Sequence, residues 1–139
     1  MRSVAILRWL TVLVLVFIAA CASLPKAGET FPDATHDFTT RLRWEDYSGI
    51  AHYLTPENRA AFLAEFDDEK DLNIVDVRLD SVEQGKDDKQ AKTCLTVEYY
   101  RLPSTIIKTS RFCLDWTYVG MNSGAPGGWQ ILSQIPSFR

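Results

Sequence analysis

The chain has 139 residues, 15 of them basic and 18 acidic, which gives a net charge of −3 at neutral pH. This length suits one ordinary domain and leaves no room for two. An acidic chain is a poor binder of phosphate backbones, so the composition argues against a nucleic-acid-binding function.

The first twenty residues have the layout of a secretory signal peptide. They carry Arg2 and Arg8, no acidic residue, and an apolar run from Trp9 to Ala20 that is broken only by Thr11. The run is about a dozen residues long, whereas a helix that crosses a bilayer needs about 20. A signal peptide over residues 1–20 is therefore expected in preference to a permanent membrane span.

The apolar run ends in Ile18-Ala19-Ala20-Cys21, in which small residues precede a cysteine. These residues resemble the lipobox of bacterial lipoproteins, with Ile18 in place of the usual leucine. The resemblance implies a thioether-linked diacylglycerol on Cys21, cleavage before it, and acylation of the new amine by a fatty acid such as palmitate. More than one acyl chain gives stable anchoring, which a single chain does not. The alternative is an ordinary thiol that follows an ordinary signal peptide.

Residues 21–34 are predicted to be a lipidated flexible tether, because the stretch after the cysteine is polar and contains Pro25 and Gly28. In the lipoprotein family, a residue other than aspartate at the second mature position goes with an outer-membrane destination. Ala22 at this position resembles that pattern. We therefore expect a lipid-anchored protein of the cell envelope, with its single domain, residues 35–139, in the periplasm. Removal of the signal peptide leaves 13 basic and 18 acidic residues, a net charge of −5.

Two helices are expected at the start of the domain. From Thr35 to Leu54 apolar residues recur at roughly helical spacing, although Gly49 weakens the middle. The following Thr55-Pro56-Glu57 offers an N-cap, a proline at the first helical position and an acid near the positive end of the helix dipole. A second helix is therefore predicted from Pro56 to about Phe66. Its buried stripe consists of Phe62, Leu63 and Phe66.

Strands are expected from Leu72 onward, where the period changes from helical to alternating. In Leu72–Gln84, Val75, Val77 and Leu79 alternate with the charged residues Asp76, Arg78 and Asp80, which is typical of a half-buried strand. Lys92–Arg101 and Ile106–Trp116 are the second and third predicted strands. Trp129–Ile135 is the fourth, after a glycine-rich flexible loop over Gly120–Gly128.

The second and third strands should form a hairpin around Leu102-Pro103-Ser104-Thr105. A four-residue loop built on a type I turn suits a proline in its second position. If Arg101 and Ile106 close this hairpin, the numbers of directly opposed residues sum to 207. The register then pairs apolar residues with apolar ones and charges with charges along both strands.

Cysteine parity leads to the same register. Three cysteines leave one unpaired in an exported chain, and lipidation of Cys21 removes the odd one. Cys94 and Cys113, whose numbers sum to 207, can then form a disulfide in an oxidising compartment, at a non-hydrogen-bonded pair where side chains approach closely. The alternative is two thiols side by side on the sheet.

These elements predict an α+β domain in which N-terminal helices pack on a curved antiparallel sheet of about four strands in a meander. Leu54-Thr55-Pro56-Glu57 at the second helix and Gly127-Gly128-Trp129-Gln130-Ile131 at the last strand resemble the NTF2-like, cystatin-like superfamily. The resemblance implies a curved sheet wrapped around a helix, with room for a conical pocket. Members include isomerases, dehydratases and non-catalytic binding modules, so the fold by itself leaves the function open.

No metal or cofactor site is expected. The two histidines, His36 and His52, are separated by sixteen residues, which on one continuous helix would point them to nearly opposite sides. Some enzymes of the NTF2-like superfamily use an Asp or His base with tyrosine donors. Asp46, Tyr47, His52, Tyr99 and Tyr100 could supply such a set, although solvated and core roles explain the same residues and no catalytic motif matches.

A ligand pocket is the second candidate site. Its proposed lining is Tyr47, Tyr99, Trp116 and Trp129, although large aromatic residues on strands are also typical of a core. We therefore expect a non-enzymatic binding or structural module that meets an envelope protein or a small apolar ligand. The alternative is a small-pocket isomerase or hydrolase.

Overall fold

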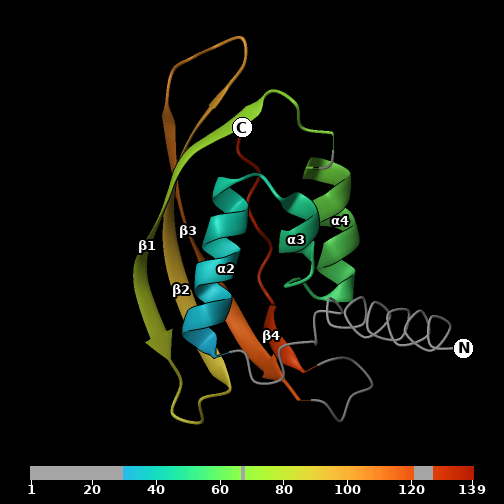
Figure 1. Cartoon of the computed structure of the whole chain (residues 1–139), viewed down its shortest axis with the longest axis vertical. Helices are drawn as coiled ribbons and strands as arrows, with labels where there is room; N and C mark the ends of the chain where they lie inside the picture. The colour runs from blue at the N-terminus through green and yellow to red at the C-terminus, as the bar shows by residue number, and fades with distance from the viewer. Residues whose placement is uncertain (1–29, 67, 121–126) are drawn as a thin grey trace, which may run out of the picture.

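The computed structural model describes residues 30–66, 68–120 and 127–139. Three helices precede four strands in these ranges (Figure 1): α2 (Phe31–Arg43), α3 (Tyr47–Ala51), α4 (Pro56–Phe66), β1 (Leu72–Gln84), β2 (Gln90–Arg101), β3 (Lys108–Val119) and β4 (Gly128–Ile131). The expected signal peptide, the lipobox with Cys21 and most of the expected tether lie outside the described residues.

The folded domain begins earlier than the sequence predicted. Thr30 caps α2 by accepting a hydrogen bond from the backbone N–H of Asp33, and a proline occupies the first turn. Phe31 and Ala34 are both buried. The assignment of residues 31–34 to a flexible tether was therefore wrong, because Phe31 supplies apolar surface to the core.

The single helix predicted from Thr35 to Leu54 is two helices. α2 ends at Arg43, and Glu45 has φ 57°, a left-handed conformation that a continuous helix does not contain. The Glu45 carboxylate accepts a hydrogen bond of 2.8 Å from the backbone N–H of Ile74. Asp46 then caps α3 through the N–H of Gly49. A contact with a distant strand thus accompanies the break, which periodicity does not reveal.

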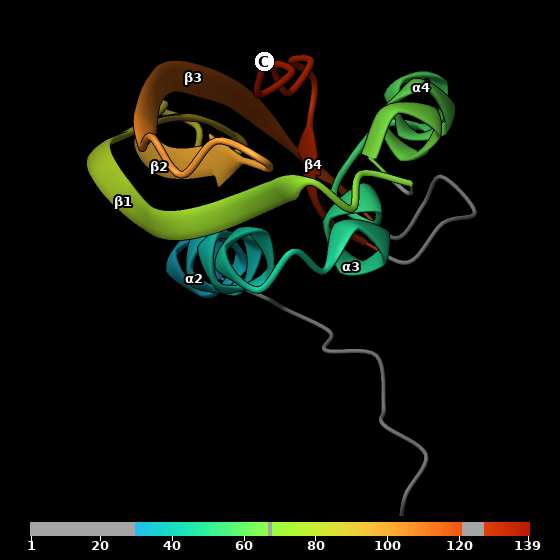
Figure 2. The ribbon, with the colours of Figure 1, turned by 90° about the horizontal axis from the view of Figure 1, so that it is seen from above.

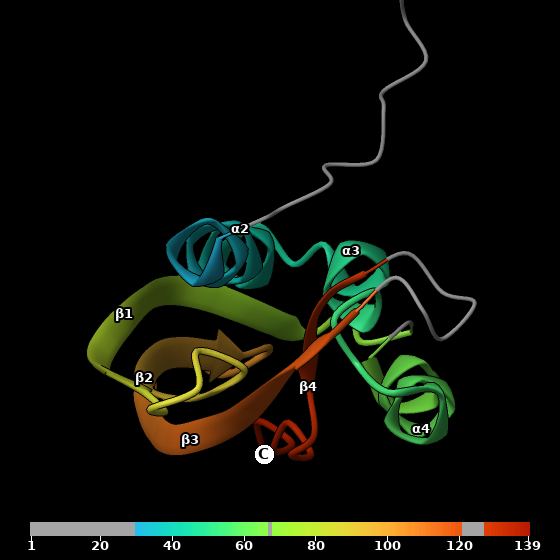
Figure 3. The same cartoon turned by 90° about the horizontal axis from the view of Figure 1, so that it is seen from below.

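The predicted helix over residues 56–66 is confirmed. α4 buries Phe62 and Phe66, and Leu63 packs against the core while partly exposed. Figures 2 and 3, which look along the domain from its two ends, show α3 between α2 and α4, and α2 beside β1.

The sheet is the predicted antiparallel meander, in the order β1-β2-β3-β4. β1 has the predicted bounds, but its pairing with β2 shifts register between Ile74 and Asp76 and again between Leu79 and Ser81. Such bulges bend a strand and increase its twist, in keeping with the curled sheet in Figures 2 and 3. Val75 at the first shift and Leu79 at the second are 38% and 41% exposed, so the simple alternation predicted for this strand was wrong at both positions.

The predicted hairpin register is confirmed from the Gln90–Thr117 pair to the Tyr99–Lys108 pair. Cys94 lies opposite Cys113, and the two form a disulfide with Cα atoms 4.0 Å apart, a short separation typical of a non-hydrogen-bonded pair. The turn differs from the prediction, because Tyr99 opposite Lys108 is the last pair and Arg101 and Ile106 do not close the hairpin. The Leu102–Pro103 peptide bond is cis.

The fourth strand is shorter than predicted and ends at Ile131. Ile131 also bridges to Leu54, and the next N–H, that of Leu132, donates to the carbonyl of Asp115. Beyond it the chain leaves the sheet and buries Ile135 and Phe138 in the core. Of the predicted loop over 120–128, residues 121–126 lie outside the described residues.

Candidate functional site

The four aromatic residues predicted to line a pocket are divided between two parts of the core. Trp116 is fully buried and donates a hydrogen bond of 2.9 Å from Nε1 to the hydroxyl of Thr93. Its ring meets those of Phe31 and Phe38 edge-on, at centroid distances of 5.6 and 5.5 Å. Trp129 packs on Phe31 from another side, at 4.6 Å. These two tryptophans bury the inner side of α2.

The two tyrosines belong to a second aromatic group. Tyr99 packs on Phe138 at 5.2 Å, and its hydroxyl donates to the carbonyl of Arg139. Tyr47 lies against Phe62 and Phe66 of α4, at 6.2 and 5.3 Å. The four predicted residues therefore do not line a common cavity.

The hydroxyl of Tyr47 is buried and has no hydrogen-bond partner within the described part of the chain. Burial raises the pKa of this phenol well above its usual range, and the nearby carboxylates of Glu45 and Glu69 raise it further. The group is therefore neutral across the physiological range. A buried, neutral phenol between aromatic rings is a packing residue.

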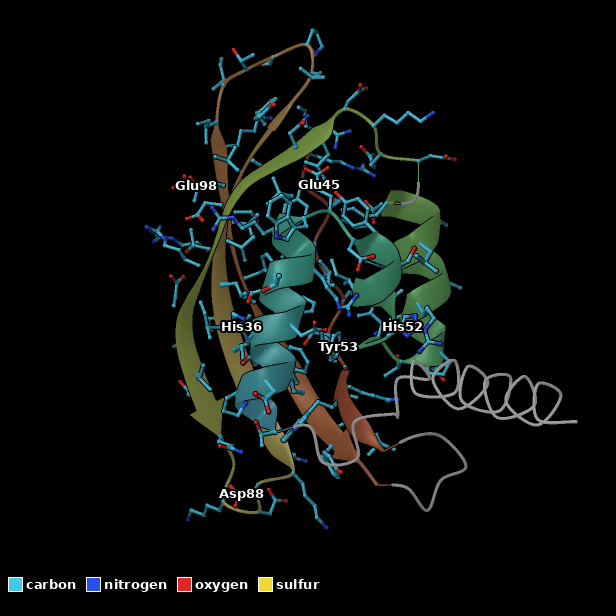
Figure 4. The ribbon with its side chains drawn as sticks, viewed as in Figure 1. His36, Glu45, His52, Tyr53, Asp88 and Glu98 are labelled. Atoms are coloured by element: carbon cyan, nitrogen blue, oxygen red, sulfur yellow. A yellow bond between two sulfur atoms is a disulfide. The ribbon has the colours of Figure 1, made fainter. Side chains whose placement is uncertain are left out.

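The predicted acid–base set is not assembled. The carboxylate of Asp46 accepts from the N–H of Gly49 at 2.9 Å and from Arg41 at 2.6 Å. The Gly49 hydrogen bond, followed by that from Arg41, holds the pKa of Asp46 below its usual value. His52 is exposed at the end of α3, and His36 is exposed on α2 (Figure 4). A carboxylate that stays charged and is engaged by a cation makes a poor general base.

A polar network that the sequence analysis missed joins α2 to α3. Arg41 donates from Nε to Asp37 at 2.6 Å and from its terminal nitrogen to Asp46 at 2.6 Å. The hydroxyl of Tyr53 donates to the same Asp37 oxygen at 2.7 Å. The spacing of Asp37 and Arg41, one helical turn apart, was visible in the sequence. The contacts to Asp46 and Tyr53 depend on the turn between the helices.

Within the described residues, two hollows lie elsewhere on the domain. One of about 400 Å³ opens beside the β1–β2 turn. Its lining is Glu83, Gln84, Gly85, Gln90, Ala91, Lys92, Asp115, Trp116 and Leu132. The other, of about 90 Å³, lies between α4 and the segment containing Ile135. Trp116 is the single member of the predicted pocket that borders either hollow. Among the described residues there is no cluster of three metal-ligating side chains.

Exposed apolar side chains gather at two places instead. The first is the loop between β2 and β3, where Leu102, Ile106 and Ile107 are 48%, 72% and 55% exposed. Figure 1 places this loop and the start of α2 at opposite ends of the domain. The sequence pattern predicted a turn for part of this segment and a strand for the rest, and neither prediction indicated that its aliphatic side chains are exposed.

The second place is beside β1. Trp44 is 77% exposed, and the residues before and after it bind β1: Arg43 pairs with Asp76 at 3.2 Å, and Glu45 accepts from Ile74. Val75, the residue between those two strand positions, is the exposed bulge residue. The flanking contacts therefore fix the backbone at Trp44 beside this part of β1.

Comparison with known proteins supports the fold and no more. A SEC-C motif-containing protein from Psychrobacter arcticus is similar in structure, with a TM-score of 0.58 at 6% identity, over 84% of this chain and 66% of that one. A SEC-C motif-containing protein from Rhodopseudomonas palustris has a TM-score of 0.50 at 10% identity, over 70% and 72%. No family model matches the sequence, and no curated protein matches it significantly. At such identities these likenesses establish a shared α+β fold alone.

Within the ranges that the structure covers, no helix combines the length and the apolar character needed to cross a membrane.

Proposed function

We propose that this protein is a lipid-anchored protein of the cell envelope whose domain acts as a non-enzymatic binding module in the periplasm. One observation carries the proposal. The chain has three cysteines, two of them form the Cys94–Cys113 disulfide, and the third is Cys21 in the lipobox-like sequence. A disulfide favours an oxidising compartment, and each cysteine then has a role that export explains.

Binding rather than catalysis is supported by how the polar residues are used. The carboxylate of Asp46 serves as a helix cap and an ion-pair partner, and the ring of Tyr47 packs against Phe62 and Phe66. The exposed apolar side chains at the β2–β3 loop offer a contact surface of the kind that binding modules use. The resemblance to the NTF2-like superfamily forms part of this proposal, supported by the curled sheet with helices packed against it.

The test is the intact mass of the full chain, expressed with its own N-terminus and extracted from membranes, before and after reduction. We expect the mass of residues 21–139 plus acyl chains, and a gain of two hydrogens on reduction of the disulfide. The matched control is Cys21→Ser, which should lose the acyl mass and keep the gain on reduction. An unmodified wild-type mass would remove the support for the anchor and for the envelope location.

A further inference from the structure

The β2–β3 loop, residues 102–107, presents an apolar tip to solvent. Leu102, Ile106 and Ile107 are each about half exposed or more, and Pro103 beside them is exposed as well. The loop contains no charged residue. Contiguous exposed aliphatic side chains on a small domain mark an interaction site. The loop projects beyond the helices (Figure 1). A projecting apolar loop suits insertion into another surface rather than enclosure of a ligand.

Hydrogen bonds and an ion pair fix the start of the loop to the rest of the domain. Arg101 donates to the Glu69 carboxylate at 2.7 Å and to the carbonyl of Phe138 at 3.0 Å. The N–H of Leu102 donates to the carbonyl of Asp71 at 2.8 Å. These bonds tie the root of the loop to the α4–β1 connection and to the C-terminal segment. The aliphatic side chains are therefore displayed in a defined place, which lowers the ordering cost of insertion.

The segment that carries the tip is basic. From Tyr99 to Leu114 the chain has three basic residues and no acidic one, although acids outnumber bases in the whole chain. Lys108 and Arg111 are exposed, and within the described ranges neither belongs to an ion pair. Three acids adjoin this segment: Glu69 is paired with Arg101, Asp71 is exposed beside the root of the loop, and Glu98 lies opposite Thr109. All three lie outside the loop, so the first charges that follow its apolar residues along β3 are those of Lys108 and Arg111.

We propose that this loop inserts its aliphatic side chains into an anionic lipid bilayer, with Lys108 and Arg111 meeting the lipid phosphates. Strand residues rise by about 3.3 Å each, so Arg111 lies roughly 10 Å along β3 from Lys108. Interfacial segments bury apolar groups about 5–10 Å into the headgroup and acyl boundary, and each basic residue near an anionic surface adds attraction. An apolar tip suits the acyl region of that boundary, and the cations that follow it suit the headgroup region.

The loop and the N-terminal end of the domain lie on opposite sides of the molecule. In a protein held by an N-terminal anchor, the loop is a second contact, which either lays the domain along the membrane or reaches another bilayer. The inference about the loop does not depend on lipidation of Cys21, because it rests on the exposure and charge of residues 102–111.

The experiment uses the full chain with a fluorophore on Thr105→Cys, reconstituted in phosphatidylcholine vesicles with or without phosphatidylglycerol. Acceptor vesicles of both compositions are then added, so that contact with either bilayer is seen. We expect a blue-shifted, brighter emission with phosphatidylglycerol, reduced by salt. The same fluorophore on Lys86→Cys, in the β1–β2 turn, should not respond. The intact mass of each labelled protein reports acylation separately, so a failed anchor and a failed loop are distinguishable.

Two variants test the cause of the response. Ile106→Ser with Ile107→Ser should weaken the apparent affinity for anionic vesicles by roughly tenfold per side chain, because less apolar surface is buried. Lys108→Gln with Arg111→Gln should weaken it by about fivefold per charge and flatten the salt dependence. Both pairs are exposed, so unchanged thermal unfolding is the control for folding. No spectral change in any vesicle, or a change that survives both variants, would overturn the proposal and favour a protein partner.

Discussion

Single residues in this domain are constrained most tightly where α2 meets α3. Gly49 lies inside a short helix, where alanine is normally the better helix former by about 1 kcal/mol. A Cβ atom built at Gly49 would collide with the guanidinium of Arg41 and the carboxylate of Asp46. The glycine therefore leaves room for the ion pair that crosses over it.

We predict that Gly49→Ala destabilises the protein by about 1–3 kcal/mol, because the Arg41–Asp46 contact must open. Urea denaturation would measure the change. The matched control is Gly128→Ala, where an added Cβ meets nothing within 4 Å. A neutral or stabilising Gly49→Ala would show that the ion pair moves aside at little cost.

The carboxylate of Asp46 makes stability depend on pH. The Gly49 N–H and Arg41 lower the folded-state pKa of this carboxylate. The carboxylate therefore stabilises the folded state above the unfolded pKa of about 4, and this stabilisation is lost as the pH falls through the folded pKa. Wild type should therefore exceed Asp46→Asn in free energy of unfolding at pH 7, and the difference should shrink below pH 4. A difference that is equal at pH 7 and pH 3 would contradict this origin.

At the scale of elements, the β2–β3 hairpin and α2 show opposite outcomes for sequence-based prediction. The hairpin register followed from the two cysteine positions and the pattern of the strands, and the Cys94–Cys113 pair confirms it. The start of α2 did not follow, because Phe31 looks like part of a polar tether until its packing against Trp129 and Trp116 is seen.

Replacing both Cys94 and Cys113 by serine should lower the free energy of unfolding by about 3 kcal/mol, since the closed loop no longer restricts the unfolded chain. The fold should persist, because Cys113 is exposed and Cys94 points to the opposite sheet face from the buried Leu95 and Val97. Reductant is the control: it should destabilise wild type and leave the double variant unchanged. An equal effect of reductant on both proteins would exclude the disulfide as the cause.

Phe31→Ala tests the corrected start of the domain. Because Phe31 is 3% exposed, its removal should cost about 3–5 kcal/mol, measured by thermal or urea unfolding. Lys26→Ala, in the part of the expected tether that lies outside the described residues, is the comparison and should leave stability unchanged. Equal stability of the two variants would restore the boundary at residue 35.

At the scale of the whole molecule, the C-terminal segment joins α4 to the sheet. Phe138 is 1% exposed and contacts Phe66 of α4 at 5.9 Å, Tyr99 of β2 at 5.2 Å and Phe112 of β3 at 6.1 Å. A residue without helix or strand structure thus links three elements that are distant in sequence.

We predict that Phe138→Ala costs about 3–5 kcal/mol and loosens α4 before the hairpin. Amide hydrogen exchange should show a larger loss of protection in residues 56–66 than in β2 and β3. Ile106→Ala, at an exposed position, serves as the control. A uniform loss of protection across the domain would show that α4 does not depend on this contact in particular.

Local patterns by themselves were sufficient for α4, for β1 as a strand, for the meander and for the disulfide register. In α4 a cap, a proline and an apolar stripe all indicate the same helix, and in the hairpin the pairing of neighbouring segments is set by short-range geometry. The expected anchor at Cys21 also comes from a local motif, and it stays a prediction.

Only the tertiary structure decided the break at Glu45, the bulges in β1, the early start of α2 and the exposure of the β2–β3 loop. Each depends on a partner distant in sequence: the N–H of Ile74 for Glu45, the pairing with β2 for the bulges, Trp129 for Phe31, and the ties of Arg101 for the loop. The predicted aromatic pocket also depended on tertiary structure. Whether an aromatic residue fills a core or lines a surface is set by the residues that pack against it. Neighbours along the chain specify local conformation, whereas burial is a property of the assembled domain.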